Sequence, residues 1–531
     1  MVFGMASNEA AVRALTLLHH PSLPQALNAF TRPSHLKQAH AHLVVTGLTR
    51  RLFTATRLLA CAAISALRDL LYAETIFRHV EVPTFFMYNT MIRAFSECPG
   101  QDCLEGVVYY VRMLRNGVLP DNFTHPFVLR SCSLSSQLLI GRQVHAHVVK
   151  FGSGAEVYVV NNMLSMYSSC REMGDARQVF EECSEFVDVV SWTSLVTGYA
   201  KAGDIDVAKS YFDRMPRRNV ISWNAMISGY AQSGRISDAR KLFDMMPERD
   251  VSSWSAVISC YAQCKMCAEA LRLFKEMVGG GIVANEAAVV SAVSACAQLR
   301  ASEWGTWLHE YTVENGMAID VILGTALVDM HGKCGNVEKA VEVFNLMPER
   351  NVCSWNSMIA SLALNAHGKQ ALSLFWQMQG VGHIPNHITF TAVLSGCSHS
   401  GFVEEGRQIF SLMTEKYQLE PWSEHYGLMV DLLGRAGLIR EAVEFIKGMH
   451  IEPHPGLWGA LVAACKIHGE IELGKQLGKY LIELEPDHGG RYALLSDLFA
   501  SIERWDDVEL VRNSFVQRKV PKTPGNSIIE L

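Results

Sequence analysis

The sequence predicts an all-α solenoid in which helical hairpins stack one on the next, and a tandem repeat is the first reason. The chain has 531 residues, and the segment 189–219 is repeated without a gap as 220–250. Trp192 recurs as Trp223, so the period is 31 residues. A unit of this length is too short to enclose its own core, and tandem repeats of about 20–50 residues are typical of solenoids.

The register of the repeat continues along the chain beyond the tandem. Counting from Trp254, units of 35, 35 and 31 residues lead to position 355, which is also Trp. Phe274, Phe344 and Phe375 follow the same spacing. Agreement over 101 residues argues against chance, and it predicts that units of alternating length follow one another without a linker.

Each unit is predicted to hold two helices. In the first copy, apolar residues recur at i, i+3, i+4 and i+7, which places them on one helix face; they are Trp192, Leu195, Val196 and Tyr199. We expect Gly203 to end this helix and Asp204 to cap the next one. Pro216 is expected to stop the second helix, and Ala208 to allow close helix packing. We interpret Trp192 and Trp223 as core residues.

Thirteen such units are expected between residues 17 and 454. They are 17–51, 52–84, 85–121, 122–156, 157–188, 189–219, 220–250, 251–285, 286–320, 321–351, 352–386, 387–422 and 423–454. Residues 455–531 also show helical pairs, but these diverge from the repeat. Residues 1–16 carry no repeat pattern, and Arg13 is the only strong base near this end. We interpret this N-terminal segment as no more than a remnant of a targeting peptide.

Composition excludes several classes of protein. Hydrophobic residues make up 49% and charged residues 19% of the chain, so it is folded rather than disordered. The longest apolar run, 58–67, is shorter than the roughly 20 residues of a membrane span, which argues against a membrane partner. The net charge of −6 offers no general attraction for nucleic acid. The 14 cysteines are scattered, and we expect them to be reduced and buried.

Two families of helical repeats are compatible with this pattern. The spacing Ala208-x3-Phe212-x3-Pro216 resembles tetratricopeptide repeats, which have a period of about 34 residues and grip peptides. The units here instead alternate between 31 and 35 residues, and several begin with Trp/Tyr-Asn, such as Trp223-Asn224. These two features are similar to pentatricopeptide repeats.

The sequence therefore resembles the plant organellar pentatricopeptide-repeat (PPR) proteins, and among them the PLS class, E subgroup, which has no DYW deaminase domain. The motifs that carry the narrower resemblance are Ser398-His399-Ser400-Gly401, Asp431-Leu432-Leu433-Gly434-Arg435-Ala436-Gly437 and Leu481-Ile482-Glu483-Leu484-Glu485-Pro486. The resemblance covers about residue 17 to Leu531. It implies an all-α, right-handed superhelical solenoid of helix-turn-helix (pentatricopeptide) repeats, followed by an E domain at 455–531.

The resemblance also implies single-stranded RNA as the partner, with one base bound per repeat. In the family, the fifth and last residues of a repeat together choose the base. The corresponding pairs here are Asn89/Asp121, Asn161/Asp188, Thr193/Asn219, Asn224/Asp250, Ser255/Asn285, Thr325/Asn351 and Asn356/Asn386. The second residue of a repeat wedges between bases, and the candidates for base stacking are Phe86, Tyr158, Val190, Ile221 and Ile322, with Ser252 and Cys353 at the same position. A single polar residue of this set could equally be an ordinary helix cap.

By the family's code, these pairs read U, U, A, U, A, A and C or U. With gaps for the long repeats, the implied RNA is U-x-U-A-U-A-x-A-Y from 5′ to 3′. The code reads the long repeats poorly or not at all, and their pairs are Pro126/Glu156, Val290/Asp320 and Thr391/Trp422. Thr56/Thr84 and Gly427/His454, towards the two ends of the array, also depart from it.

Proteins of this subgroup specify organellar cytidines for deamination to uridine, which needs a zinc site built from H-x-E and P-C-x-x-C segments. His79-Val80-Glu81 and Cys264-Lys265-Met266-Cys267 match parts of these patterns. They belong to separate repeats, and Gln263 stands where the Pro is needed. We therefore expect no catalytic residue, no metal and no cofactor, and we expect that the chain is not an enzyme.

The expected function is that of the site-recognition factor for organellar C-to-U RNA editing. The chain would recruit a trans-acting DYW-type deaminase and editing accessory proteins through its E domain. The expected location is a mitochondrion or a chloroplast, with the mitochondrion slightly favoured. One alternative is a factor for the stabilisation, splicing or translation of organellar RNA, and another is a peptide-binding helical-repeat scaffold.

Overall fold

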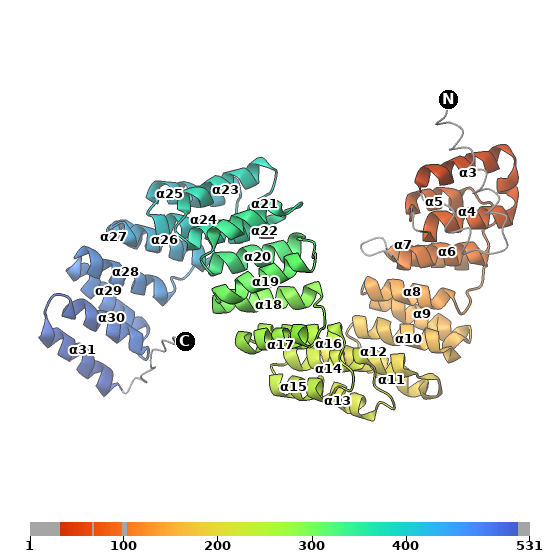
Figure 1. Ribbon diagram of the computed structural model, residues 1–531, viewed down its shortest axis with the longest axis horizontal. Coiled ribbons are helices and arrows are strands. Elements are labelled where there is room, and N and C mark those ends of the chain that lie inside the picture. Colours follow the sequence, from red (N-terminus) through yellow and green to blue (C-terminus); the bar gives the residue numbers. More distant parts are fainter. Residues whose placement is uncertain (1–31, 66–67, 98–102, 519–531) are drawn as a thin grey trace. The chain divides into compact units, whose positions relative to one another are not determined.

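The computed structural model describes residues 32–65, 68–97 and 103–518, and the regular structure within these ranges is helical, without a strand (Figure 1). The predicted all-α class is therefore confirmed. Residues 1–16, interpreted as a targeting remnant, lie outside the described ranges. The chain divides into two compact units, Met1–Cys260 and Tyr261–Leu531, and helical hairpins stack within each.

In the first unit, the first helices of successive hairpins form one row, in which α4, α6, α8, α10, α12 and α14 each pack on the next. The second helix of each hairpin packs on the first. The bounds are α3 (Pro33–Val45), η1 (Leu48–Arg50), α4 (Leu52–Ile64), α5 (Leu70–Arg78), α6 (Phe85–Ser96), α7 (Cys103–Arg115), α8 (Thr124–Leu134), α9 (Leu138–Lys150), η2 (Ser153–Ala155), α10 (Val157–Ser169), α11 (Met173–Glu182), η3 (Ser184–Phe186), α12 (Val189–Ala202), α13 (Ile205–Arg214), α14 (Val220–Gln232), α15 (Ile236–Met245) and α16 (Val251–Gln263).

The second unit repeats this arrangement, with α18, α20, α22, α24, α26, α28 and α30 in the row of first helices. The bounds are α17 (Cys267–Gly279), α18 (Glu286–Leu299), α19 (Ser302–Glu314), α20 (Val321–Lys333), α21 (Val337–Leu346), α22 (Val352–Leu364), α23 (Gly368–Gly380), α24 (His387–Ser400), α25 (Val403–Ser411), η4 (Leu412–Lys416), α26 (Ser423–Arg435), α27 (Ile439–Lys447), α28 (Pro455–His468), α29 (Ile471–Leu484), α30 (Gly489–Ala500) and α31 (Trp505–Gln517).

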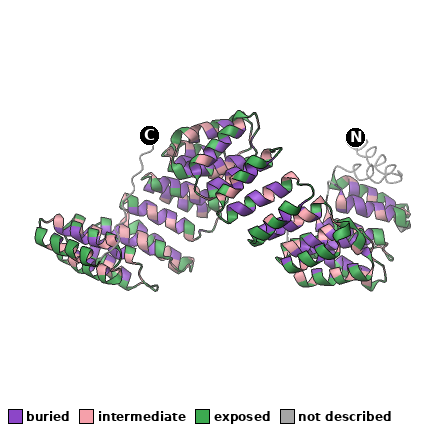
Figure 2. Ribbon diagram, turned by 90° about the horizontal axis from the view of Figure 1, so that it is seen from below, coloured by how far each residue is buried: buried purple, intermediate pink, exposed green. Residues whose placement is uncertain are grey.

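Aromatic pairs between neighbouring repeats fill much of the core. Phe212 is 1% exposed, and its ring meets that of Trp223 edge to face at 4.9 Å. The pair Phe344–Trp355 repeats this geometry at 5.1 Å. Such pairs contribute about 0.5–1.5 kcal/mol beyond the area they bury. Buried positions accordingly follow the faces by which helices touch (Figure 2). Trp223 is buried as predicted, whereas Trp192 is only half-buried.

An arginine after each Met-Pro turn closes the second helix in three of the 31-residue units. Arg218 donates from Nε to the carbonyl of Phe212 at 3.0 Å, and its guanidinium lies 4.8 Å from the centre of the Phe212 ring. Arg249 and Arg350 make the same two contacts with Phe243 and Phe344. The arginine thus bonds a carbonyl in the last turn of the helix and also covers the phenylalanine ring, which ties the turn to the helix end.

Three sequence predictions on local structure have mixed outcomes. Gly203 ends α12 with a left-handed φ of 93°, as predicted. Asp204 precedes α13, but its carboxylate accepts no capping hydrogen bond, so that prediction is wrong. Its backbone, at φ −82° and ψ 60°, is outside the extended region that capping residues adopt. Cysteines are free in the described ranges, but Cys353 is exposed, which contradicts the expectation of burial. No described helix is long and apolar enough to cross a membrane.

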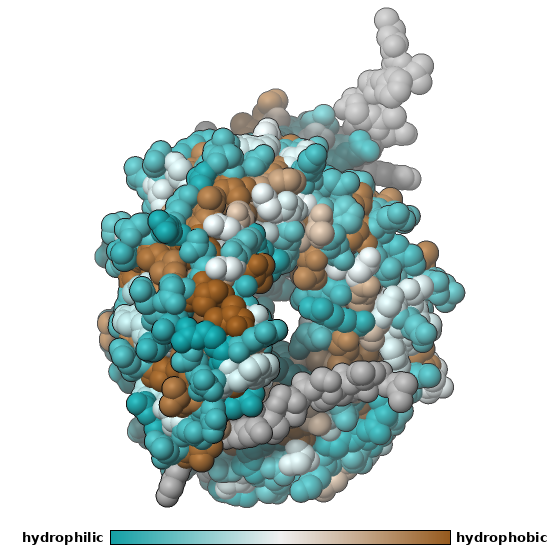
Figure 3. All heavy atoms as spheres, turned by 90° about the vertical axis from the view of Figure 1, so that its left-hand side faces the viewer, coloured by the Kyte–Doolittle hydropathy of each residue, from teal (hydrophilic) through white to brown (hydrophobic). Residues whose placement is uncertain are grey.

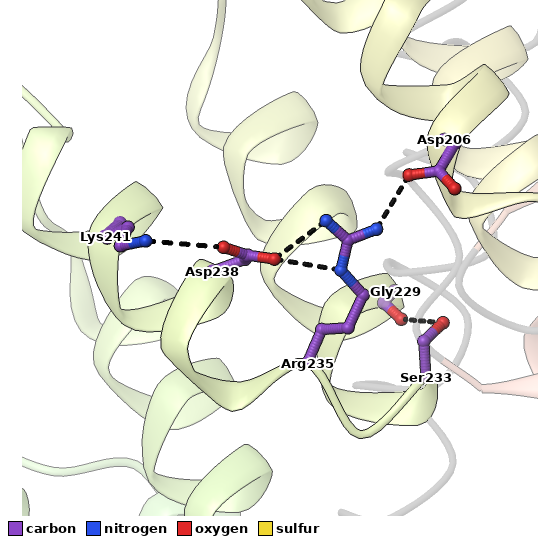
Figure 4. Close-up of polar contacts among 6 residues, drawn as sticks. All are labelled: Asp206, Gly229, Ser233, Arg235, Asp238 and Lys241. Atoms are coloured by element: carbon purple, nitrogen blue, oxygen red, sulfur yellow. Dashed lines mark hydrogen bonds and ion pairs between the residues drawn. The ribbon is translucent and has the colours of Figure 1, made fainter.

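Exposed ion pairs join second helices of neighbouring repeats, as at Arg235 (Figure 4). Its Nη1 donates to Asp206 of α13 at 2.7 Å, and its Nε donates to Asp238 of α15 at 2.9 Å. Lys241 lies 3.7 Å from the other oxygen of Asp238. Exposed pairs contribute about 0–1 kcal/mol each, so the buried rings rather than these bridges hold the repeats together.

Close approach of first helices predicts a strong effect at Gly332 in α20. A Cβ there would lie 2.0 Å from the hydroxyl oxygen of Ser361 and 3.0 Å from its Cα, which belongs to the backbone of α22. Gly332→Ala is therefore expected to lower the stability of the α20–α22 region by about 1–3 kcal/mol. Hydrogen exchange of amides in α20 and α22, with a thermal melt of the whole chain, measures this.

Gly174 provides the matched control for Gly332, because a Cβ at this helical position would meet no atom within 4 Å. Gly174→Ala is expected to leave exchange in α20 and α22 unchanged, and to raise helix stability locally by up to about 1 kcal/mol. Unchanged protection of α20 and α22 in Gly332→Ala would contradict the close packing described here.

His125 in α8 predicts sensitivity to acid. Its ring is fully buried, and neither ring nitrogen has a hydrogen-bond partner among the described residues. Burial, together with the nearby His147, lowers the pKa of His125 to about 4, although Asp121 acts in the opposite direction. The folded state therefore favours the neutral ring, and stability falls as the pH drops from about 6.5, the pKa in the unfolded chain, towards the folded value.

His125→Phe is expected to remove this contribution, since the ring packs between Tyr110 and Phe151. Melting temperatures between pH 7 and pH 4.5 should fall less steeply in this variant than in the parent chain. His42→Phe, at an exposed position, is the control and should keep the slope of the parent chain. An equal slope in His125→Phe and the parent would show that His125 does not titrate in this range.

Candidate functional site

The predicted last residues of the repeats are helix caps. Asp188 is the N-cap of α12, and its Oδ1 accepts hydrogen bonds from the backbone N–H groups of Val190 at 2.9 Å and Ser191 at 3.0 Å. Equivalent bonds at 2.8–3.1 Å, from the backbone N–H three residues further along, reach Oδ1 of Asp121, Asn219, Asp250, Asn285, Asn351 and Asn386. The donor is the third residue of the next helix except at Asp121, where Thr124 is the first residue of α8. One side-chain oxygen of each residue is thus fixed by the fold.

The structure brings three of the predicted asparagine pairs into direct hydrogen bonds. Nδ2 of Asn89, on α6, donates to Oδ1 of Asp121 at 3.0 Å. The same bond joins Asn161 to Asp188 and Asn356 to Asn386, each at 3.2 Å. The two members of each pair are about one repeat apart in sequence, so the stacking of first helices places them together.

A buried hydroxyl, which the sequence analysis missed, locks these three pairs. Thr124 donates to Oδ1 of Asn89 at 2.7 Å, Ser191 to Asn161 at 2.5 Å, and Thr389 to Asn356 at 2.6 Å. The hydroxyl donates to the amide oxygen of the asparagine, and the amide N–H donates to the capping residue. These two bonds together fix the orientation of the asparagine side chain. The signal in the sequence is a Ser or Thr three residues after the last residue of the repeat, the position of a capping box.

Two further pairs lie close together with weaker or indirect contacts. The hydroxyl of Thr193 donates to the carbonyl of Val189 at 2.7 Å and lies 3.3 Å from Oδ1 of Asn219. Thr325 reaches Asn351 through the hydroxyl of Ser354, which lies 2.9 Å from Thr325 and 3.1 Å from Asn351. Thr193 thus contacts its capping asparagine directly, whereas Thr325 does so only through Ser354.

Asn224 and Asp250 differ from the other pairs. The hydroxyl of Ser253 donates to Oδ1 of Asp250 at 2.7 Å instead of reaching Asn224. The side-chain oxygen of Asn224 is buried without a hydrogen-bond partner among the described residues. Ser255 belongs to the first unit, where its hydroxyl donates to the carbonyl of Val251 at 2.9 Å, and Asn285 belongs to the second, where it caps α18.

The predicted stacking residues are exposed, although they are apolar or aromatic. The exposed fraction is 38% for Phe86 and 65% for Ile221, and Tyr158, Val190 and Ile322 lie between them. Phe53, Phe123 and Ile388 occupy the same position near the start of their helices and are exposed as well, but the sequence analysis did not name them. The sequence could have identified them, because each is the second residue of its repeat. Exposed hydrophobic side chains are visible among hydrophilic ones on the face in Figure 3.

Hydrogen bonds keep Asp188 ionised. Partial burial alone would raise its pKa, but the N–H of Ser191, the amide of Asn161, the hydroxyl of Ser191 and the N–H of Val190 together lower it below the ordinary value. At neutral pH the carboxylate is therefore an acceptor only. Its Oδ2 makes no hydrogen bond with any described residue, and the same holds for Oδ2 of Asp121 and Asp250.

The capping asparagines leave a hydrogen-bond donor free, whereas the aspartates leave an acceptor free. In Asn219, Asn351 and Asn386 the oxygen accepts the capping bond, while Nδ2 donates to no described residue. The repeats that end in Asp121, Asp188 or Asp250 therefore offer a free acceptor, and those that end in Asn219, Asn351 or Asn386 offer a free donor. The two kinds of pair thus differ in the polar group that they leave free.

The segments that resemble parts of a zinc site make local contacts. His79 follows α5, and its Nδ1 lies 2.7 Å from the carbonyl of Thr75. Cys264 lies in the turn between α16 and α17, and the thiol of Cys267 donates to the side chain of Gln298 at 3.5 Å. Within the described ranges, no group of three or more His, Cys, Asp or Glu residues is placed to hold a metal ion.

Comparison with known proteins identifies the family. The PPR repeat model matches residues 158–186, 190–220, 221–251, 252–282, 325–352, 388–417 and 424–452. The PPR repeat family model matches residues 350–399, and the E motif model matches residues 468–530. A pentatricopeptide repeat-containing protein of Arabidopsis thaliana is 39% identical over 499 residues, which are 93% of this chain and 88% of that protein. The chain belongs to the pentatricopeptide-repeat family.

Other relatives and solved structures agree with this assignment. A second pentatricopeptide repeat-containing protein of Arabidopsis thaliana is 42% identical over 500 residues, covering 93% of this chain and 90% of its own length. A third, named as mitochondrial, is 35% identical over 588 residues and covers 97% and 86%. The crystal structure of the pentatricopeptide repeat protein PPR10 from maize has a TM-score of 0.57 and 17% identity, over 94% of this chain and 84% of that one. Its complex with an 18-nt psaJ RNA element has a TM-score of 0.51. These two structures establish the likeness of fold.

Proposed function

We propose that this pentatricopeptide-repeat protein binds single-stranded RNA and reads its sequence with one pair of residues per repeat. The observation that carries the proposal is the recurrence, at one register on successive first helices, of three features. These are an Asn or Thr at the fifth position, a capping Asp or Asn with one unused polar group, and an exposed side chain at the second position. A helix cap alone requires neither of the other two features.

The unused polar groups match the edges of different bases. The free Oδ2 of Asp121, Asp188 or Asp250 can accept the N3–H of uracil, which is a donor. The free Nδ2 of Asn219, Asn351 or Asn386 can instead donate to N1 of adenine or N3 of cytosine, which are acceptors. The order of the pairs then corresponds to U-x-U-A-U-A-x-A-Y.

Stacking supplies affinity that needs no positive charge. Aromatic side chains such as Phe86 and Tyr158 present flat apolar surface, and stacking of a base on an aromatic ring contributes about 1–3 kcal/mol. Neutral amides and hydroxyls supply the edge contacts. A chain with a net charge of −6 can bind RNA by these means, although general electrostatic attraction does not assist it.

The direct test is binding of two labelled RNAs that have the same composition. One carries U-x-U-A-U-A-x-A-Y and the other carries the same bases in scrambled order. We expect the first RNA to bind more tightly by a factor of at least about 10, since each correct edge contact contributes about 1–3 kcal/mol. Equal affinity for both RNAs would reject sequence reading, and a peptide partner with no RNA binding would favour the scaffold alternative.

The proposal extends to organellar C-to-U editing, and the match of residues 468–530 to the E motif supports it. In this role the chain has no chemistry of its own and recruits a trans-acting DYW-type deaminase and accessory proteins through the segment 455–531. The proposed location is a mitochondrion or a chloroplast, and a relative that is named as mitochondrial supports an organellar location. Organellar transcripts of a loss-of-function line distinguish the outcomes. Loss of one C-to-U change supports editing, whereas altered transcript ends or splicing supports the alternative role in RNA processing.

A further inference from the structure

The repeat 387–422 ends in an aromatic residue instead of a paired polar one. Trp422 occupies its last position, where other repeats have Asp or Asn, and this large ring is 49% exposed. One face of the indole lies against the imidazole of His387, with ring centres 4.2 Å apart and planes only 5° from parallel. An exposed tryptophan held flat in this way presents its remaining surface to a ligand.

The stack is held in place by its surroundings. His387 starts α24, and its Nε2 lies 3.1 Å from the backbone carbonyl of Glu420, an acceptor, so the ring donates there. Beside the two rings is a cavity of about 550 Å³, lined also by Gln418, Leu419, Pro421, Ser423 and Ile451. A volume of this size fits the range of ligand sites, and its flat aromatic wall suits a flat ligand.

The fifth residue of this repeat is engaged as in the threonine repeats, but its last residue has neither a carboxylate nor an amide to leave free. The hydroxyl of Thr391, the fifth residue, donates to the carbonyl of His387 at 3.0 Å. Buried His425 replaces the usual Ser or Thr, and its Nδ1 accepts the N–H of Trp422 at 2.9 Å. Its Nε2 then carries the proton, which it donates to the carbonyl of His387 at 2.9 Å. Thr391 therefore has no proton left for a base edge.

We propose that Trp422, backed by His387, stacks a nucleobase of the bound RNA without reading which base it is. The base belongs to the nucleotide immediately 3′ of the one that faces Asn356 and Asn386, because 387–422 follows that repeat in the array. This inference rests on the proposed RNA binding. Stacking suits the local charge, since the exposed Glu420 and Glu424 would repel a phosphate but not an uncharged base.

The test compares five RNAs that share U-x-U-A-U-A-x-A-Y and differ only in the next 3′ nucleotide, which is A, C, G, U or an abasic residue. The unmodified protein should bind the four base-containing RNAs within about threefold of one another. The abasic RNA should bind about 5- to 100-fold more weakly, in line with the usual strength of base–aromatic stacking. Trp422→Ala should bind all five alike, at the level of the abasic RNA, while Trp422→Phe keeps part of the difference.

Ile467→Ala, at an exposed position on α28, is the matched surface control. It should bind the five RNAs as the parent chain does. Equal binding of abasic and base-containing RNAs by the parent chain would overturn the stacking site. The proposed function would survive that result if scrambling the nine preceding positions still weakened binding. A clear preference for one base at the tested nucleotide would overturn the claim that this repeat does not read base identity. Absence of binding to every RNA would reject the proposed function, and the stacking site with it.

Discussion

Replacing Asn224 with Ser and Asp250 with Asn together is expected to change the base preferred at the fifth position of the footprint from U to A. Asn at 250 keeps an oxygen for the cap that now accepts the N–H of Ser253 at 2.8 Å. The free acceptor Oδ2 becomes a free donor, which suits N1 of adenine rather than N3–H of uracil. Ser at 224 reproduces the small hydroxyl of the Thr193 and Thr325 repeats.

The expected size of the switch is about 5- to 100-fold in relative affinity, because a well-formed pair of base contacts discriminates by about 1–3 kcal/mol. Stability should change little, since the cap persists and the oxygen of Asn224 has no hydrogen-bond partner to lose. Binding to four RNAs that differ only at the fifth position measures the effect.

Asn162→Ser is the matched control for this switch. Asn162 follows Asn161, the fifth residue of its repeat, but its amide donates to the carbonyl of Tyr158 at 2.8 Å within the same helix. Its replacement should leave the base preference at every position unchanged. If the double variant melts normally and still prefers U, the pair 224/250 does not read the base, and the chemical argument from free donors and acceptors loses its support.

Repetition is what made much of the fold predictable. The recurrence of Trp, Phe and Met-Pro at one spacing identified the helical hairpins, because the residues that pack between repeats must recur whenever the interface recurs. The prediction that Asp204 caps α13 was wrong because it relied on residue type alone. A cap also depends on backbone angles, which the identity of one residue does not determine.

The candidate site was only partly predictable from the sequence. The paired positions came from the resemblance, and the structure adds what holds them. Thr124, Ser191 and Thr389 lie three residues after a capping residue, and their hydroxyls also reach back to the preceding repeat. That second contact depends on the distance between two helices. For the same reason, nothing in the sequence distinguishes Asn224, whose oxygen lacks such a contact, from Asn161, which has it.

Asp188 offers the clearest separation of a structural role from a reading role. Asp188→Ala removes the acceptor for Val190 N–H and Ser191 N–H as well as for Asn161, so it should lower local stability by about 0.5–2 kcal/mol. It should also weaken binding to RNAs with any base at the third position. Asp188→Asn keeps the cap, and it converts the pair to the Asn/Asn type of Asn356 and Asn386. At neutral pH this variant should melt closer to the parent chain than Asp188→Ala does, while losing its preference for U over C.

The pH dependence of stability adds an independent readout of the same carboxylate. The pKa of Asp188 is lowered in the folded chain, so its contribution is complete above the unfolded value of about 3.9 and is lost as the pH falls through the folded value. Both variants should lack this contribution, but only Asp188→Ala should also lack the cap at neutral pH. Melts therefore report the cap, and binding curves report the base preference, for each of the two variants. Should Asp188→Asn retain a full preference for U, Asp188 is a helix cap and nothing more, because a donor at this place cannot accept the N3–H of uracil.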